Sequence, residues 1–99
     1  MAFEIKYTLK AKHDIFKAMD YYETVVSIKV AEFFYQSILN AEKTLKSVNY
    51  FEQIFKDFHR LPLRNFPYIF IYKIENKTKT IKIYRVFQTS QDPAKYPEN

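Results

Sequence analysis

Hydrophobic and polar residues alternate one by one near the start of the chain. The hydrophobic positions are Phe3, Ile5, Tyr7 and Leu9, and Glu4, Lys6, Thr8 and Lys10 lie between or directly after them. A period of two residues is typical of a strand with one buried face. We therefore expect a first strand over residues 3–9.

The hydrophobic period then changes to that of a helix. Ile15, Ala18, Met19 and Tyr22 fall at i, i+3, i+4 and i+7, and Asp14 is placed to cap this helix. After a break near residues 24–27, Ser27 is placed to cap a second helix. Its apolar stripe consists of Val30, Ala31, Phe34, Ile38, Ala41, Leu45 and Val48. Two helices with a short joint predict a helical hairpin.

The second half of the chain favours strands. Segments 68–75 and 80–87 are rich in β-branched and aromatic residues, and the turn 76–79 joins them. Residues 51–59 also fit a helical spacing, but we expect a loop that passes into a short strand near residues 55–61. In the last strand we expect Ile81, Ile83, Arg85 and Phe87 on one face. Because both of its faces are partly apolar, this strand should be central in the sheet.

These elements predict an α+β fold in one domain, residues 1–99. The N-terminal strand and the helical hairpin precede a three-stranded antiparallel meander, and both helices pack on one face of a single sheet. A chain of 99 residues suits one such domain. The other face of the sheet should remain partly open.

Composition excludes several kinds of site. The chain has no Cys, hence no disulfide or thiolate metal site, and no Gly, hence no phosphate-binding glycine loop or nucleophile elbow. A turn that needs a positive φ must use another residue, and Asn49, Asn65 and Asn76 are the candidates. His13 and His59 lack a carboxylate cluster at ligand spacing. We therefore expect no metal and no cofactor.

The chain carries no sign of a membrane or secreted protein. Its N-terminus lacks the apolar segment of a signal peptide, and its longest apolar run, residues 66–72, is far shorter than a membrane span. Together with the absence of Cys, this fits a protein of the reducing cytoplasm. We expect a cytoplasmic protein without a membrane partner.

The net charge of +5 is concentrated in the sheet half. Residues 56–85 hold eight Lys/Arg and two acids, whereas residues 1–50 hold seven Lys/Arg and six acids. A basic sheet suits nucleic acid, the ribosome or an acidic protein, although ordinary solubility charge gives the same pattern. Fixed cations can bind phosphates and stabilise charge during phosphoryl transfer.

Several segments resemble one family. Residues 14–23 (DIFKAMDYYE), residues 60–74 (RLPLRNFPYIFIYKI) and the ending IYRVF then TSQDP resemble the RelE/ParE superfamily of type II toxin–antitoxin systems. The ending is typical of ParE-like members. The resemblance implies a small bacterial toxin, of the kind found in plasmid stabilization systems, and a hetero-oligomer with an acidic antitoxin. We expect the antitoxin around Ile15, Met19 and Tyr22 or on the basic sheet.

The two branches of this superfamily act on different targets. RelE-like members cut mRNA on the ribosome, and ParE-like members inhibit DNA gyrase. The resemblance places Arg60 at one basic strand site of the nuclease pattern and Tyr96 at its tail Tyr. For a nuclease, we expect Arg60, Arg64, Arg85 and Tyr96 to be the catalytic residues. However, Pro62, Ile69 and Ser90 stand where the nuclease pattern has cations, and Gln88 stands where the ParE-like pattern often has His.

We therefore favour a ParE-like toxin that acts by binding and not by catalysis. Its expected target contacts are Arg60, Arg64 and Arg85. An mRNA interferase, or a degenerate member without toxicity, remains the alternative.

Overall fold

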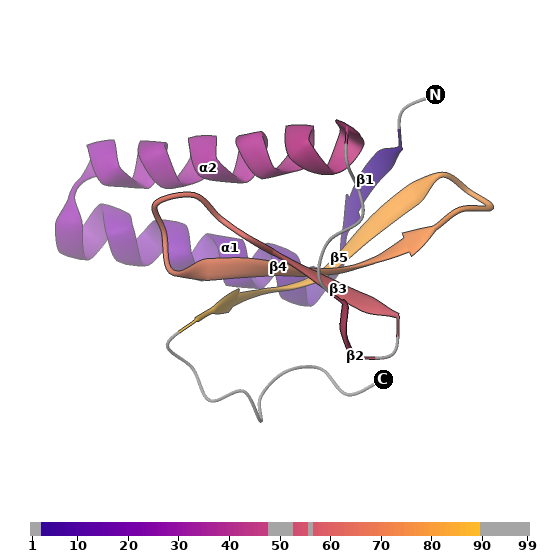
Figure 1. The fold of residues 1–99 in the computed structure, drawn as a ribbon. Coiled ribbons are helices and arrows are strands. Elements are labelled where there is room, and N and C mark those ends of the chain that lie inside the picture. Colours follow the sequence, from indigo (N-terminus) through magenta and orange to yellow (C-terminus); the bar gives the residue numbers. More distant parts are fainter. Residues whose placement is uncertain (1–2, 48–52, 56, 90–99) are drawn as a thin grey trace.

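The computed structural model describes residues 3–47, 53–55 and 57–89 (Figure 1). Its elements are β1 (Glu4–Tyr7), α1 (Leu9–Tyr21), the π-helical turn η1 (Tyr22–Val26), α2 (Ile28–Ser47), β2 (Gln53–Phe55), β3 (Phe58–Pro62), β4 (Tyr68–Glu75) and β5 (Thr80–Gln88). The strands form one sheet in the order β1-β5-β4-β3-β2. β1 runs parallel to β5, and the other neighbours are antiparallel.

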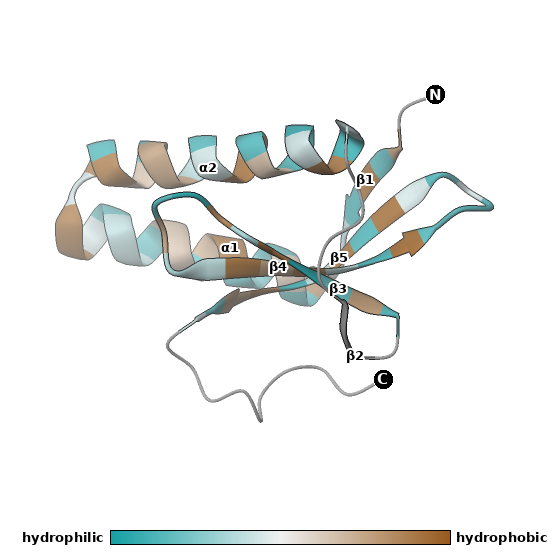
Figure 2. Cartoon of the chain, in the orientation of Figure 1, coloured by the Kyte–Doolittle hydropathy of each residue, from teal (hydrophilic) through white to brown (hydrophobic). Residues whose placement is uncertain are grey.

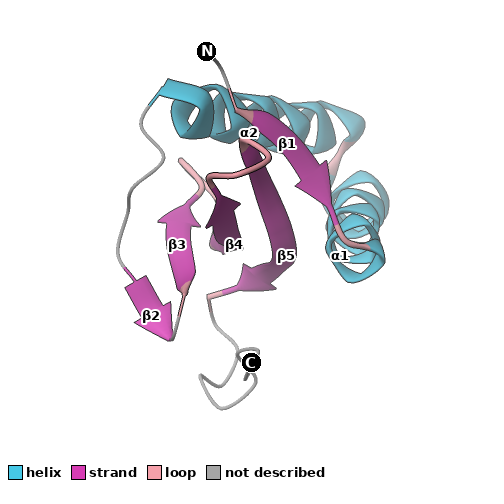
Figure 3. Ribbon diagram, turned by 90° about the vertical axis from the view of Figure 1, so that its right-hand side faces the viewer, coloured by secondary structure: helices cyan, strands magenta, loops and turns pink. Residues whose placement is uncertain are grey.

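The helices cover one face of this sheet, as expected. Phe34, Ile38 and Leu45 of α2 belong to the same buried cluster as Phe70 and Tyr72 of β4. Apolar residues recur along both helices at intervals of about one turn (Figure 2). In the view turned by 90°, α1 lies beside β1 and α2 extends across the top of the sheet (Figure 3). The sheet itself is mixed and not purely antiparallel, because β1 joins it in parallel.

The opposite face carries a second, smaller cluster. It consists of Phe58, Ile69, Ile71 and Phe87, with Tyr84 packed against it. All of these residues come from strands, so among the described residues no helix covers this face. We call it the open face. Because β4 is buried on both faces from Tyr68 to Tyr72, its sequence is a continuous apolar run.

The helix boundaries differ from the sequence prediction at one end. α1 begins at Leu9, and its N-cap is Thr8, whose Oγ1 accepts a hydrogen bond from the Ala11 N–H at 3.1 Å. The prediction that Asp14 caps this helix is wrong, because Ala11 already starts the buried stripe one turn earlier. At the second helix the prediction is confirmed, since the Val30 N–H donates to Ser27 Oγ at 3.1 Å. Val48 lies outside the described residues.

The expected alternation along the last strand is also wrong. A β-bulge interrupts the pairing of β4 with β5, because Tyr72 pairs with Ile83 whereas Ile71 pairs with Arg85. Tyr84 is the extra residue, and it shifts the alternation by one position. Ile83 therefore faces the helices, whereas Phe87 belongs to the open face. The central position of β5, between β1 and β4, is as predicted.

The region before β3 contains one more strand than expected. β2 pairs with β3 through Gln53 and Phe55, so four strands follow the helices where we expected three. The predicted strand at residues 55–61 corresponds to β3, which spans Phe58–Pro62. A short strand such as β2 gives little periodic signal in the sequence.

Among the described residues of this glycine-free chain, two turns use a positive φ. Asn65 has φ 70°, as expected for one of the three Asn candidates, but the second such residue is Lys79, with φ 52°. Asn76 does not have a positive φ, and Asn49 lies outside the described residues. For a residue with a Cβ, the left-handed region costs about 1–2 kcal/mol.

Replacing Lys79 with Gly should therefore stabilise the protein. We expect the free energy of unfolding to rise by about 0.5–1 kcal/mol, because the gain at the left-handed position exceeds the extra entropy of the unfolded chain. Urea denaturation measures the change. Lys77→Gly, in the same turn and with no positive φ, is the control and should lower stability or leave it unchanged. Equal effects of the two substitutions would contradict the argument.

Buried tyrosine hydroxyls make the fold sensitive to alkali. Burial, with a smaller contribution from Tyr22, raises the pKa of Tyr68 to about 12. Burial also raises the pKa of Tyr72 and, together with the hydrogen bond to Glu42, that of Tyr7. In the folded state the pKa of each of these tyrosines exceeds the unfolded value of about 10. The neutral tyrosines therefore contribute to the free energy of unfolding below pH 10, and this contribution is lost as the pH rises toward 12.

We therefore expect the melting temperature to fall steeply between about pH 10 and pH 12. Tyrosinate absorbance and circular dichroism, recorded together, should show that these tyrosines ionise only as the protein unfolds. Tyr68→Phe should reduce the slope of stability against pH. Full ionisation of all tyrosines with native circular dichroism would contradict this expectation.

Candidate functional site

The open face carries two of the predicted arginines in one row. In the register of the sheet, Arg60 of β3 and Arg85 of β5 both pair with Ile71 of β4. Because neighbouring strands lie about 4.8 Å apart, the two backbones are separated by about 10 Å. The structure thus brings Arg60 and Arg85 to opposite sides of one buried Ile.

The next row of the open face is apolar. Ile69 pairs with Pro62 on one side and with Phe87 on the other. Pro62 and Ile69 are two of the positions at which the nuclease pattern has cations, and they are direct cross-strand neighbours. The third position, Ser90, lies outside the described residues, as does Tyr96.

Two lysines stand opposite each other at the far end of the same face. Lys73 and Lys82 are cross-strand partners. The Lys73 Nζ lies 4.7 Å from the centroid of the Phe58 ring, and the Lys82 Nζ lies 5.4 Å from that of Tyr84. Among the described residues, neither lysine forms an ion pair. Like charges directly opposite each other destabilise a sheet, so this pair is a candidate for binding an anion.

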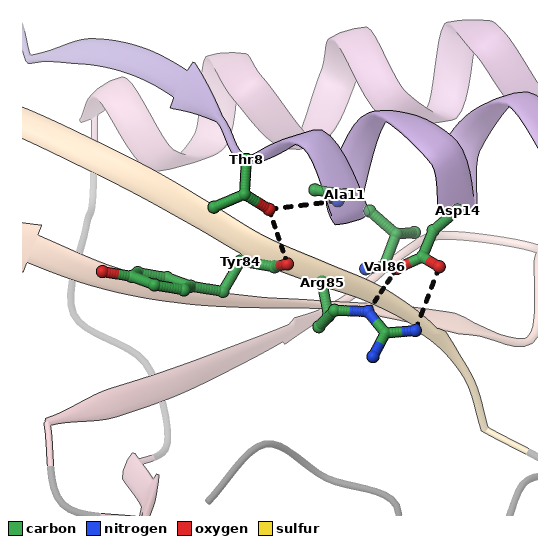
Figure 4. Close-up of polar contacts among 6 residues, drawn as sticks. All are labelled: Thr8, Ala11, Asp14, Tyr84, Arg85 and Val86. Carbon is green, nitrogen blue, oxygen red and sulfur yellow. Dashed lines mark hydrogen bonds and ion pairs between the residues drawn. The ribbon is translucent and has the colours of Figure 1, made fainter. Parts of the chain in front are cut away.

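Arg85 has a fixed position at the edge of this face. Its Nε lies 2.7 Å and its Nη2 3.1 Å from the two carboxylate oxygens of Asp14 on α1 (Figure 4). The guanidinium carbon also lies 4.6 Å from the centroid of the Phe87 ring. Asp14 is the more buried partner, with 13% of its side chain exposed against 29% for Arg85. The pair therefore joins α1 to the edge of the sheet.

The side chains of Thr8, the N-cap of α1, and of Asp14 in α1 replace a missing strand at this edge. β1 pairs with β5 only as far as Ile83, where the Thr8 N–H donates to the Ile83 carbonyl at 3.0 Å. Thr8 Oγ1 then donates to the Tyr84 carbonyl at 2.8 Å, and the Val86 N–H donates to Asp14 at 2.9 Å. The backbone of β5 beyond β1 is therefore bonded to the two side chains that Figure 4 shows above it.

Arg64 lies apart from the other two predicted arginines. It is exposed in the turn between β3 and β4, and its carbonyl accepts a hydrogen bond from Ser37 Oγ of α2 at 3.1 Å. It lines a cavity of about 370 Å³ together with Phe33 and Phe66. The three expected target contacts therefore do not form one site.

The three residues expected to bind an antitoxin are partly used in the core. Ile15, Met19 and Tyr22 are half-buried and pack against the cluster beneath the helices. The Tyr22 ring lies 5.3 Å from that of Phe66 and 5.4 Å from that of Phe34. These side chains keep only part of their surface for a partner.

Exposed apolar side chains lie on the same helical elements, and the sequence reasoning missed them. They gather on α1, on η1 and at the start of α2, and they include Phe16, Tyr21, Val25, Val26, Ile28 and Phe33. We call this set the helical patch. The sequence contained a signal for these residues, because Phe16 and Val25 interrupt segments whose outer positions are otherwise polar. A search for one apolar stripe per helix overlooks such additional apolar positions.

The described residues contain neither a cluster of metal-binding side chains nor a membrane-spanning helix. No group of three or more His, Asp or Glu side chains among them could hold a metal ion. None of the helices in the described ranges is both long and apolar enough to span a bilayer.

Known structures share this arrangement of elements, although sequence comparison alone finds no relative. No family model matches the chain, and no curated protein does. A chain from the chromosomal ParDE toxin–antitoxin system of P. aeruginosa is 22% identical, with a TM-score of 0.75, over 88% of this chain and 96% of the other.

Two RelE structures give lower scores. A chain of the RelBE2 toxin–antitoxin complex from Mycobacterium tuberculosis is 14% identical, with a TM-score of 0.60, over 92% of this chain and 95% of the other. The isolated E. coli RelE toxin is 12% identical, with a TM-score of 0.58, over 94% and 90%. The fold expected from the sequence is thus confirmed: the chain has the fold of the RelE/ParE toxins, with the higher score to the ParDE structure.

Proposed function

We propose that this chain is the toxin of a type II toxin–antitoxin system and that it resembles ParE in its action. It binds and inhibits a protein target, DNA gyrase, in the cytoplasm, and an acidic antitoxin neutralises it. The fold supports the general role, because the similar structures come from the ParDE and RelBE systems and from RelE. The open face supports the choice of mechanism.

The observation that carries the proposal is the lack of free charge where a nuclease needs it. Ile69 and Pro62 form an apolar row beside Arg60, and the charge of Arg85 is compensated by Asp14. Phosphoryl transfer depends on fixed cations around the reacting phosphate. Among the described residues, the central rows of this face hold one uncompensated cation, Arg60, and Lys73 and Lys82 lie at its far end. Such a centre suits contact with a protein better than cleavage of RNA.

The antitoxin has a separate place in this proposal. The helical patch exposes large apolar residues, with 68% of Phe16 and 63% of Val25 accessible. An amphipathic antitoxin segment laid along α1 would cover this patch and reach the open parts of Ile15, Met19 and Tyr22. Its acidic residues would meet the basic side chains of the toxin, as charge complementarity requires.

One observation favours the alternative function, a RelE-like mRNA endoribonuclease. Lys73 and Lys82 hold two cations close together on the open face, beside Tyr84. Such a pair suits a phosphate backbone. In that case Arg60, Arg64, Arg85 and Tyr96 are the candidate catalytic residues.

Induced expression of the chain alone in bacteria separates these functions. Gyrase inhibition predicts growth arrest with intact mRNA and disturbed DNA supercoiling. Arrest with cuts at fixed codon positions would support the nuclease. Normal growth would indicate a degenerate member that has lost toxicity.

Arg60 offers the sharpest test of the binding site. Arg60→Glu should weaken target binding by at least about tenfold, because it replaces a positively charged hydrogen-bond donor with a negatively charged acceptor that repels an acidic group of the target. Growth arrest should be lost while the melting temperature stays within a few degrees of the wild type.

The matched control is Lys29→Glu, which changes the net charge equally but lies on α2, away from the open face. It should keep full toxicity. If Arg60→Glu remains toxic, or if both variants lose toxicity together, the assigned face is wrong.

A further inference from the structure

The guanidinium of Arg85 has unused hydrogen-bonding capacity in a fixed orientation. An arginine has five N–H donors, and Asp14 uses two of them, on Nε and Nη2. No other acceptor in the described part of the chain is hydrogen-bonded to this group. Asp14 and the Phe87 ring fix its plane, so less side-chain entropy is lost when a ligand binds.

Cavities lie on both sides of this ion pair, along the groove between α1 and β5. One, of about 330 Å³, is lined by Asp14, Lys17, Tyr21, Arg85 and Gln88 among others. The other, of about 360 Å³, is lined by Leu9, Lys10, His13, Asp14 and Arg85. Arg85 borders both cavities, so a group entering the groove from either side meets the remaining N–H donors.

We propose that Arg85 is an oxyanion site that takes a carboxylate side chain of the target protein, and that Asp14 is its positioning residue. This inference rests on the proposed function and deepens it. It assigns the ligand chemistry to a carboxylate and gives Asp14 a role that the sequence pattern did not suggest.

The charges in the groove favour a carboxylate over a doubly charged phosphate, such as inorganic phosphate or a phosphate monoester. Asp14 already cancels the charge of Arg85, which leaves Lys10 and Lys17 as the lysines that line the groove. A doubly charged phosphate would lie beside the Asp14 carboxylate and meet strong repulsion, whereas a singly charged carboxylate meets less. A planar carboxylate also matches two parallel N–H donors of one guanidinium edge.

Nuclear magnetic resonance of the purified full chain tests the ligand class. The side-chain N–H signals of Arg85 are followed during titrations with sodium acetate and with inorganic phosphate, near neutral pH and at constant ionic strength. We expect acetate to shift them saturably and at lower concentration than phosphate. Asp14→Asn should reverse this order, because the repelling charge is gone. Tighter binding of phosphate by the wild type, or no saturable shift with either anion, would overturn the assignment.

A double-mutant cycle tests the positioning role. Asp14→Asn keeps an oxygen that can accept from the Val86 N–H but removes the charge that orients Arg85. Acetate binding in this cycle is followed by the backbone N–H signals of Val86 and Phe87, which line the groove and are present in every variant. We expect Asp14→Asn and Arg85→Ala each to weaken acetate binding at this site, by about tenfold for Arg85→Ala, and Asp14→Asn to have no further effect once Arg85 is Ala. If Asp14 had only a structural role, Asp14→Asn would lower the melting temperature both with Arg85 and with Ala at position 85. The losses of acetate affinity caused by the two substitutions would then be additive.

The control is Asp20→Asn, an exposed carboxylate of the same helix, which should leave acetate binding unchanged. Growth arrest by the same variants separates this inference from the proposed function. If the wild type binds acetate at Arg85 but does not inhibit gyrase, the target is wrong and the oxyanion site stands. If it inhibits gyrase and Arg85→Ala inhibits equally well, the site is not the target contact.

Discussion

The carboxylate of Asp14 joins the helical layer to the sheet at the point where β1 has ended. It accepts one backbone N–H of β5 and binds the guanidinium of the preceding residue. A buried N–H without a partner costs about 1–3 kcal/mol, and hydrogen bonds to charged groups contribute about 1.5–3 kcal/mol. One side chain therefore bonds the edge of the sheet beyond β1, connects α1 to β5 and orients the arginine that borders the groove.

The bulge at Tyr84 decides which side chains reach the open face. Without it, strict alternation would place Phe87 and Arg85 on the same side as Ile83, beneath the helices. The extra residue moves Phe87 into the smaller cluster and directs Arg85 to the groove beside α1. Bulges are common next to functional sites because they redirect single side chains at little cost to the rest of the strand.

Periodicity in the sequence was sufficient for the main elements and their layers. The stripe from Phe34 to Leu45 is buried against the sheet, and the β-branched runs of β4 and β5 are buried on both faces of it, so local pattern and tertiary packing agree. The start of α1 was missed because the signals conflict, since Thr8 fits both the alternation of a strand and the cap of a helix. The bulge was missed because a single extra residue leaves no trace in hydrophobicity.

The candidate site was predictable only in part. Arg60 and Arg85 lie in one row, on either side of Ile71, because of the register, which the sequence limits but does not determine. The separation of Arg64 follows from a turn that packs against α2, and the partner of Arg85 is a residue 71 positions away in the chain. Contacts of that kind depend on the complete fold and have no local signature.

The parallel pairing of β1 with β5 has a consequence for the order of folding. Thr8 and Tyr84, which meet where β1 ends, are separated by 76 positions. Chains are synthesised from the N-terminus, and pairings over such distances form slowly because a large loop must close first. The helical hairpin can form early, whereas the first strand must wait for one of the last. A nascent chain thus presents its helices to a partner before its open face exists.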